Sequence, residues 1–391
     1  MRRVYFDNNA TTPVLPEVYE AMRPCFTEVY GNASSIHHYG QEARAAVERA
    51  RESVGELLNA RPAEIVFVSG GTESDNLAVF GIMEPGDHLI TSLIEHSAVR
   101  NTAKHLEERG CEVTFISPDS RGLLDPDDVR KALKPNTKLI SIMMANNETG
   151  AVQPVEEIGR IAAEADVWFH TDAVQAAGKV PIDVDKIGCD LLSISGHKIH
   201  APKGVGALYI RRGTLLTPRQ WGGNHERQRR AGTENVAGIV GLGKAAEIAI
   251  QAFNNGDDQK YGAMRDRLQK GIFDVVESCG VNGDGAPRVP TTTNFWFDHI
   301  EGEALVIALD LKGLAVSSGA ACSSGSIEPS PVLLAMGLEK SRARASIRIS
   351  LGKQNTDDDV DFALQVIPET VAKLREISPT WKKHKETVAA T

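Results

Sequence analysis

Short apolar segments alternate with amphipathic segments from about residue 40 to residue 250, and this alternation constrains the fold most strongly. Helical periodicity extends over 41–60, where Val47, Val54 and Leu58 share one face. Strands that alternate with helices in this way predict an α/β fold with a mostly parallel sheet and helices on both of its faces. The segments that we expect to be strands are 65–68, 88–91, 113–116, 138–144, 167–170, 190–194 and 205–210.

The chain length of 391 residues exceeds what one ordinary hydrophobic core holds and indicates two domains. A polar stretch at 254–258 is typical of a boundary. We predict a large domain over 15–256 and a small α+β domain formed by 1–14 and 257–391, and we expect the tail from Lys382 onward to be frayed. The small domain is expected to contain helices at 261–277, 302–311, 331–336 and 357–376 and strands at 293–297 and 346–350.

Composition and charge exclude several classes of function. The hydrophobic share of 41% and the charged share of 24% are those of a soluble globular protein. The net charge of −9 argues against general binding to nucleic acid or anionic membranes. The longest apolar stretch, 236–250, is interrupted by Lys244 and Glu247, and the N-terminus lacks the apolar core of a signal peptide. We therefore expect a cytoplasmic protein.

The cysteines point to neither disulfides nor a metal site. The chain has five, far apart and without a CxxC pair, so a disulfide framework and a dedicated zinc site are both poor first interpretations. Four of them, Cys25, Cys111, Cys189 and Cys279, are expected to pack as small apolar residues. The fifth, Cys322, has a different sequence context.

Two expected strands are followed by residues that suit a carbonyl cofactor. Ligands bind at the carboxyl ends of strands in such sheets. Lys198 follows the segment 190–194, and a lysine amine can form a Schiff base there. Asp172 follows 167–170 and can pair with a pyridinium nitrogen, as pyridoxal 5'-phosphate (PLP) enzymes require. A surface lysine after a strand is the alternative for Lys198 taken alone.

Other strand ends offer groups for a phosphate and a ring. Gly71 and Thr72 follow the strand 65–68 and open a helix, where backbone N–H groups form an anion site. Ser195 and His197 can reach the same phosphate, although an ordinary strand-to-helix turn is the alternative. His96 begins a helix and can stack on a pyridine ring, or simply face water.

Three further polar residues could contact the cofactor or the substrate. Asn147 can donate to a phenolic oxygen or to a substrate carboxylate, and Gln175 can donate to the phenolate. Arg348, in the expected strand 346–350, can bind a carboxylate through two N–H groups, with a strand-surface arginine as the alternative.

Two segments allow more than one interpretation. Small residues surround Cys322 over 317–326, and a thiol on such a loop is a candidate nucleophile; a tight turn with an inert cysteine is the alternative. The cluster 227–230 contains three arginines, which could form a nucleic-acid patch, a solvated face, or a loop whose Thr233 reaches a phosphate.

Taken together, these motifs resemble the NifS/IscS-type cysteine desulfurases, which are PLP enzymes of fold type I in the class-V aminotransferase family. The resemblance covers nearly the whole chain and is nearest to the NifS branch. It departs from the usual pattern at Ala33, where proline is usual, at Ala320, where serine is usual, and at Pro331. The matching segments are 5–13, 31–37, 71–76, 95–96, 146–150, 170–175, 195–198, 202–206, 230–235 and 318–322.

The resemblance implies a large domain with a mostly parallel seven-stranded sheet and a small domain that carries the cysteine loop 317–329. It also implies that Lys198 holds PLP covalently and carries the Cα proton, that Asp172 keeps the ring nitrogen protonated, and that His96 stacks on the ring. The remaining cofactor contacts that it implies are Gly71, Thr72, Asn147, Gln175, Ser195 and His197. It also implies a homodimer in which Thr233 completes the phosphate site of the partner subunit.

For the reaction, the resemblance implies that L-cysteine binds with its carboxylate on Arg348 and with Asn147 nearby. The Cys322 thiolate then takes the sulfur, and the products are alanine and a persulfide on Cys322. An Fe–S scaffold protein or another sulfur acceptor would receive that sulfur, and no metal is expected.

Other readings of the sequence stay open. Another enzyme of the same fold, such as an aminotransferase, a selenocysteine lyase or a β-lyase, would not depend on Cys322 or would give pyruvate. A sulfur carrier or scaffold-binding protein would turn over slowly until its partner is added. A nucleic-acid binder using 227–230 is disfavoured by the acidic net charge.

Overall fold

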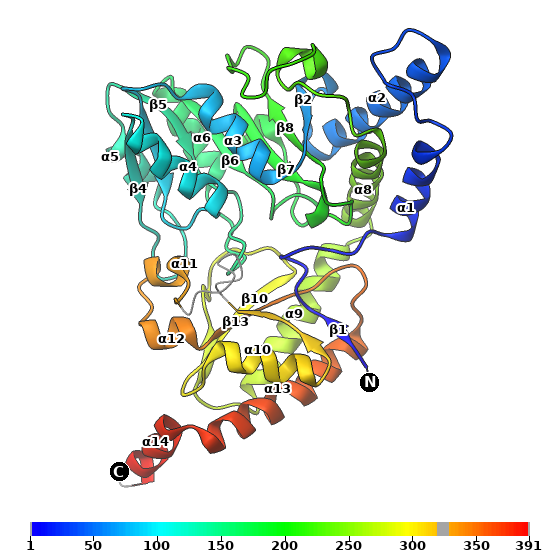
Figure 1. Ribbon diagram of the computed structural model, residues 1–391. Helices are drawn as coiled ribbons and strands as arrows, with labels where there is room; N and C mark the ends of the chain where they lie inside the picture. Colours follow the sequence, from blue (N-terminus) through cyan, green and yellow to red (C-terminus); the bar gives the residue numbers. More distant parts are fainter. Residues whose placement is uncertain (1, 319–327, 390–391) are drawn as a thin grey trace.

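The computed structural model describes residues 2–318 and 328–389, which form two bodies with separate cores (Figure 1). The larger body contains a seven-stranded sheet in the order β2-β8-β7-β6-β5-β3-β4. Only β8 runs antiparallel to its neighbours, so the predicted α/β fold with a mostly parallel sheet is confirmed. The strands are β2 (Ile65–Val68), β3 (His88–Ser92), β4 (Glu112–Ile116), β5 (Thr137–Ser141), β6 (Trp168–Asp172), β7 (Leu191–Ser195) and β8 (Gly206–Ile210).

Alternate side chains of these strands build two apolar layers, one on each face of the sheet. Phe67 and Ile140 join the cluster on one face, whereas Val66 and Leu139 join the cluster on the other. Helices cover both layers, which explains why the strands read as continuous apolar runs. These helices are α1 (Pro16–Met22), α2 (His38–Leu58), α3 (Gly71–Ile82), α4 (Ser97–Glu108), α5 (Pro126–Ala132), α6 (Val155–Glu164), α7 (Val184–Ile187) and α8 (Val236–Asn254).

Helix α8 is long and apolar enough, by length and composition, to cross a membrane. Half of that span is nevertheless buried inside the protein. Ile239, Leu242 and Ala246 pack in the same cluster as residues of α2, such as Val47. The apolar character of α8 is therefore explained by its position in the core of the large body.

The smaller body contains an antiparallel sheet in the order β12-β13-β10-β9 and its own hydrophobic core. The N-terminal residues Val4 and Phe6 belong to that core, because β1 pairs with β11. The division of the chain at residues 14 and 256 remains a prediction. The remaining elements of the chain are β1 (Val4–Tyr5), α9 (Asp257–Phe273), β9 (Cys279–Val281), β10 (Thr292–Phe297), α10 (Gly302–Leu311), β11 (Leu314–Ala315), β12 (Ser317–Ser318), α11 (Pro331–Ala335), α12 (Lys340–Arg344), β13 (Ser346–Ser350), α13 (Asp357–Ile377) and α14 (Pro379–Ala389). Helix α11 lies in this part of the chain, but its Val332 and Leu333 pack in the core of the large body.

The expectation of a frayed tail is wrong for the described residues up to 389, because Pro379–Ala389 forms helix α14. Proline suits the first position of a helix, where no N–H donor is needed. The Trp381 ring lies 4.3 Å from the Arg375 guanidinium carbon and stacks on the His384 ring at a centroid distance of 5.4 Å. These contacts attach the tail to α13.

Candidate active site

The strand ends converge between the two bodies, where the N-terminal segment crosses from β1 to α1 (Figure 1). Strands β6 and β7 are parallel neighbours, so Asp172 and the residues that follow Ser195 emerge at the same edge of the sheet. The main chain of Asn9 and Ala10 lies against this edge, since it accepts hydrogen bonds from Lys198. Segments far apart in the sequence therefore build one site.

Lys198 lies in η3 (Gly196–Lys198), the short 3₁₀ turn directly after β7, and is half-buried. Its Nζ donates to the carbonyl oxygen of Asn9 at 2.6 Å and to that of Ala10 at 2.8 Å. The alternative of a surface lysine is therefore excluded. The amine is held at a fixed point near Asp172 and His96, and its positive charge lowers the pKa of both side chains.

Asp172 is buried, and its Oδ1 accepts a hydrogen bond from the Val174 amide at 2.9 Å. Burial raises the pKa of this carboxyl, while the charges of His96 and Lys198 lower it. A positive N–H donor in the site would favour the ionised carboxylate in the same way. Asp172 thus fits a protonated ring nitrogen.

His96 caps the start of α4, because its Nδ1 accepts a hydrogen bond from the Ala98 amide at 3.1 Å. That contact leaves the ring proton of the neutral imidazole on Nε2. Burial lowers the pKa of His96, and the charges of Lys198 and Arg100 lower it further, against Asp172. His96 is therefore a neutral ring close to Asp172.

The start of α3 forms a cradle that suits a phosphate. Its N-cap is Gly70, which offers no side chain to the first N–H groups of the helix. A Cβ on Gly71 would lie 2.8 Å from Val174 Cγ2, and one on Gly70 would lie 3.7 Å from Ser195 Oγ. Thr72 is exposed at the same helix start. Gly70 has φ +154°, a backbone conformation that other residues rarely adopt, and the close approach of Val174 explains why glycine occupies position 71.

His197 lies beside the N-terminal segment rather than in water. One of its ring nitrogens, Nδ1, is 3.1 Å from Thr11 Oγ1. Burial lowers the pKa of His197 to about 4, and the charges of Lys198 and Lys203 lower it too. A neutral His197 can donate one hydrogen bond to a phosphate. With the uncapped α3, Lys198 and Asp172, the donor set fits PLP.

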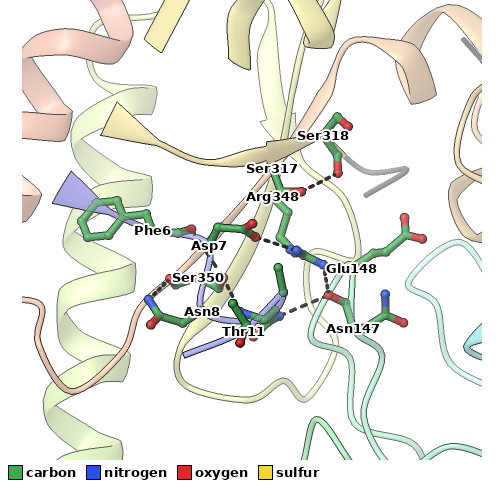
Figure 2. A network of polar contacts seen from close by, with 12 residues as sticks. Phe6, Asp7, Asn8, Thr11, Asn147, Glu148, Ser317, Ser318, Arg348 and Ser350 are labelled. Carbon is green, nitrogen blue, oxygen red and sulfur yellow. Dashed lines mark hydrogen bonds and ion pairs between the residues drawn. The ribbon is translucent and has the colours of Figure 1, made fainter. Parts of the chain in front are cut away.

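Arg348 is almost fully buried in β13, so the alternative of a strand-surface arginine is wrong. Figure 2 shows its guanidinium between Asp7 and Asn147. Nη1 donates to the Asn147 carbonyl oxygen at 2.9 Å, and Nη2 donates to Asp7 Oδ1 at 2.7 Å. Nε is buried without a hydrogen-bond partner among the residues that the structure describes. Asp7 was not predicted, although the N-terminal motif contains it.

Asn9 connects most of these groups and was also not predicted as a site residue. Its carbonyl oxygen accepts from Gln175 Nε2 at 2.9 Å as well as from Lys198. Its Nδ2 donates to the Asn147 carbonyl oxygen at 3.2 Å and to Thr292 Oγ1 at 3.0 Å. The buried side chains of Asn147 and Gln175 are thus brought together through Asn9.

Acidic residues behind Asp172 were missed as well. Asp75 and Glu95 are both buried, and burial together with the charge of Asp172 raises the pKa of each, that of Glu95 to about 8. His170 lies among them with its ring nitrogens 2.8 Å from Ser141 Oγ and 3.0 Å from Ser193 Oγ. The signal in the sequence was a histidine in the middle of an apolar strand.

Cys322 lies outside the described residues, but both described flanks of its segment reach the site. On one side, Ser317 pairs with Arg348 in the register of β12 and β13 (Figure 2). On the other side, Ser330 Oγ donates to the buried Glu148 Oε2 at 2.5 Å, next to Asn147. The chain therefore enters and leaves this segment beside the predicted carboxylate site.

The other four cysteines are poor nucleophiles. Cys111 and Cys189 are buried, and Cys25 and Cys279 are half-buried. Burial raises the pKa of all four thiols, which keeps them protonated near neutral pH.

Thr233, the predicted phosphate contact from a partner subunit, is exposed and lines a small cavity with Ser69 and Gly204. It is not in the interior of the site. Across residues 2–318 and 328–389, no His, Cys, Asp and Glu cluster suits a metal ion.

The fold and this site define a PLP-dependent transferase of fold type I. Residues 4–362 match the family model of the class-V aminotransferases. The chain is similar to cysteine desulfurase IscS of Dictyoglomus turgidum, with 47% identity over 98% of this chain and 99% of the relative. It is also similar to two solved structures. One is a NifS-like protein, with a TM-score of 0.88, 38% identity and coverage of 95% of this chain and 100% of the other. The other is SspA in complex with cysteine, with a TM-score of 0.79, 40% identity and coverage of 89% and 98%.

The chain belongs to the class-V aminotransferase family and, within it, to the NifS/IscS-type cysteine desulfurases. The predicted family, fold class and enzyme class are therefore confirmed, and membership implies dependence on PLP. The finer placement near the NifS branch stays a prediction.

Proposed function

We propose that this enzyme transfers the sulfur of L-cysteine to the Cys322 thiol. L-cysteine and the thiol give L-alanine and a Cys322 persulfide, so all atoms are accounted for. The observation that carries the proposal is that the N-terminal segment joins Lys198, which lies near Asp172 at the edge of the large sheet, to Arg348 on β13 of the small body. Of the two flanks of the Cys322 segment, Ser317 pairs with Arg348, and Ser330 donates to Glu148, next to Asn147. The solved structure of SspA with cysteine supports the choice of amino acid.

PLP, when bound, withdraws electrons from the substrate and so weakens the bonds at its α- and β-carbons. Lys198 would hold the cofactor covalently and would carry the Cα proton of the substrate. The carbonyl oxygens of Asn9 and Ala10 accept hydrogen bonds from its amine, so a released amine returns to the same point. Asp172 would accept the N–H of the ring nitrogen, and His96 would cover the ring and could move a proton through Nε2.

The substrate carboxylate has a buried partner in Arg348. Two of its nitrogens already serve Asp7 and Asn147, and these contacts fix the plane of the guanidinium. The buried Nε–H and the second hydrogens on Nη1 and Nη2 remain for the carboxylate. Asn147 can add a donor from its side-chain amide. A bidentate contact of this kind selects an α-amino acid and orients its Cα–H bond.

Cys322 accepts the sulfur because the other thiols are held in the protonated form by burial. We further propose a homodimer that acts in the cytoplasm, in which Thr233 of one subunit completes the phosphate site of its partner. In support, Thr233, Leu215 and Trp221 are all exposed on the same stretch of chain, with 81% of Leu215 and 79% of Trp221 accessible. An Fe–S scaffold protein or another sulfur acceptor would then discharge the persulfide.

The test uses the purified protein loaded with PLP. We expect a visible cofactor band that changes when L-cysteine is added, and alanine in an amount equal to that of the sulfur transferred. A peptide containing Cys322 should be heavier by one sulfur atom. Cys322→Ala should keep the cofactor band and lose sulfide release, whereas Cys25→Ala should behave as the parent does.

Three outcomes would refute parts of this proposal. Sulfide released from cysteine by Cys322→Ala in the presence of dithiothreitol would remove the role of Cys322. Pyruvate instead of alanine would indicate a β-lyase, and a chain that cannot be loaded with PLP would refute the cofactor assignment. Slow turnover that an Fe–S scaffold accelerates would favour the carrier alternative.

A further inference from the structure

Lys179 is a buried lysine that lies inside the network around Lys198, and the reaction proposed above does not use it. Only 8% of Lys179 is exposed. Its Nζ donates to Gln175 Oε1 at 2.6 Å and to Asn9 Oδ1 at 2.8 Å. Both acceptors are side-chain amides, and the main-chain carbonyl oxygen of Asn9 accepts hydrogen bonds from both Gln175 Nε2 and Lys198 Nζ. A buried amine with two short hydrogen bonds to site residues calls for a functional explanation.

These contacts fix the orientation of the Gln175 amide. Lysine offers N–H donors, so Gln175 must present its oxygen to Lys179. Its Nε2 then points the other way and donates to the Asn9 carbonyl oxygen at 2.9 Å, an atom that can only accept. The second hydrogen on Nε2 is left for a ligand. A rotated amide would place an oxygen against the Asn9 carbonyl and lose both contacts.

The same amine fixes Asn9. With Asn9 Oδ1 on Lys179, the Asn9 Nδ2 group faces the Asn147 carbonyl oxygen and Thr292. The Asn9 main chain is thereby held where its carbonyl oxygen receives Lys198 at 2.6 Å. Lys179 is thus connected to Lys198 through a single residue.

We propose that Lys179 is a positioning residue for the sulfur-transfer reaction: its amine orients the amides of Gln175 and Asn9, so that Gln175 presents its NH2 group to the cofactor and Asn9 holds the Lys198 amine. The proposal rests on the proposed function, since it assigns to Gln175 and Lys198 their roles toward PLP. It adds to that function a residue that contacts neither cofactor nor substrate.

The local chain explains how Lys179 reaches this position. The turn after β6 brings residue 179 back beneath Gln175, since the Lys179 amide donates to the Ala176 carbonyl oxygen at 2.9 Å. Gly178 adopts φ +69°, and a Cβ there would lie 2.9 Å from Ile199 Cγ2. Burial lowers the pKa of Lys179, as do the charges of Lys198 and Arg348. Even an uncharged amine keeps two N–H donors, so the two contacts do not depend on its charge.

The test compares Lys179→Met with Lys186→Met, a change at a lysine whose side chain is 72% exposed on α7. Each protein is loaded with PLP, its absorbance is titrated with pH, and the attached cofactor is fixed by borohydride and located by peptide mass spectrometry. We expect Lys179→Met to fold, to shift the pH midpoint of the cofactor band, to attach less PLP at Lys198, and to lower kcat roughly 10- to 100-fold. Lys186→Met should match the parent.

The outcomes distinguish a failure of the proposed function from a failure of the role of Lys179. A parent protein that takes up no PLP would refute the proposed function. A parent that works beside a Lys179→Met variant with the same absorbance titration, attachment and kcat would overturn the role of Lys179 alone. If Lys179→Met does not fold, Lys179→Gln replaces it, since its side chain is one bond shorter and loses both contacts. An unchanged titration in a folded Lys179→Gln would equally overturn the proposal.

Discussion

Removing one partner of the buried ion pair between Arg51 and Glu226 should strongly destabilise the large body, because the other charge would stay buried without its partner. Arg51 Nη1 and Nη2 donate to the two carboxylate oxygens of Glu226, each at 2.8 Å. Only 4% of each side chain is exposed. Glu226 Oε2 also accepts from the Phe67 amide at 2.8 Å, and Arg51 Nη1 donates to the Ile65 carbonyl oxygen at 2.8 Å. The pair thus attaches α2 and the loop before α8 to strand β2.

The magnitude follows from what each substitution leaves behind. Arg51→Met keeps the apolar stem but leaves a carboxylate in the interior with one backbone donor. Removing one partner of a buried pair costs about 3–5 kcal/mol. Glu226 also has φ 43°, a left-handed conformation that costs a non-glycine residue roughly 1–2 kcal/mol, and the pair offsets this strain. Replacing both residues by Arg51→Met and Glu226→Leu should recover part of the loss, because no uncompensated charge remains.

Urea unfolding followed by circular dichroism measures the effect. The matched control is Arg130→Met, because Arg130 and Glu164 form an exposed ion pair with a similar distance of 2.7 Å. An exposed pair contributes only about 0–1 kcal/mol. Two results would refute this reasoning. One is a loss of unfolding free energy below about 1 kcal/mol for Arg51→Met, and the other is a loss for the double variant that exceeds the sum of the losses for the two single variants.

Three further predictions concern the site. Because burial raises the pKa of Glu95 to about 8, above its unfolded value, the stability of the parent relative to Glu95→Gln should fall on the order of 1 kcal/mol per pH unit from about pH 5 to 8 and level off above; a difference independent of pH in thermal unfolding would contradict it. Gly71→Ala places a methyl 2.8 Å from Val174 Cγ2, so it should destabilise the protein by roughly 1–3 kcal/mol and weaken PLP uptake in an absorbance titration. Equal PLP loading of the parent and the variant would contradict this prediction. Ser330→Ala removes the N-cap of α11 and the donor to buried Glu148, so urea unfolding should show a free energy of unfolding lower by about 2 kcal/mol. A decrease below about 0.5 kcal/mol would show that these two hydrogen bonds do not stabilise the fold.

The fold of the large body was predictable because its signals are local. Apolar runs such as 65–68 and 190–194 appear as β2 and β7 with nearly the same bounds. The strand order and the reversal of β8 were not predictable, because they depend on contacts between distant segments. At Gly206 in β8, for example, a Cβ would lie 2.8 Å from the Gly70 Cα. Helix α14 was missed because contacts with α13 attach it.

The site residues differ in the same way, since some could be predicted from local signals and others depend on contacts between distant segments. Lys198, Asp172 and Arg348 were predicted as site residues from their sequence motifs, because an amine, a carboxylate and a guanidinium each suit one step of the expected chemistry. Lys179 and Asn9 carry no such signal, since a lysine after glycine and an asparagine in a turn are ordinary in isolation. Their importance lies in burial and in hydrogen bonds to residues more than 100 positions away, which only the folded chain brings together.

The N-terminal segment explains why this site needs both bodies. Asp7 binds Arg348 of the small body, whereas the carbonyl oxygens of Asn9 and Ala10 hold Lys198 of the large body. Thr12 continues the link by accepting a hydrogen bond from the His200 amide at 2.8 Å. Arg348, the proposed partner of the substrate carboxylate, and Lys198, the proposed carrier of the proton, are therefore fixed relative to each other through a few consecutive residues. A shift of one body against the other would change the distance between Arg348 and Lys198, so the stability of this segment sets the geometry of the reaction.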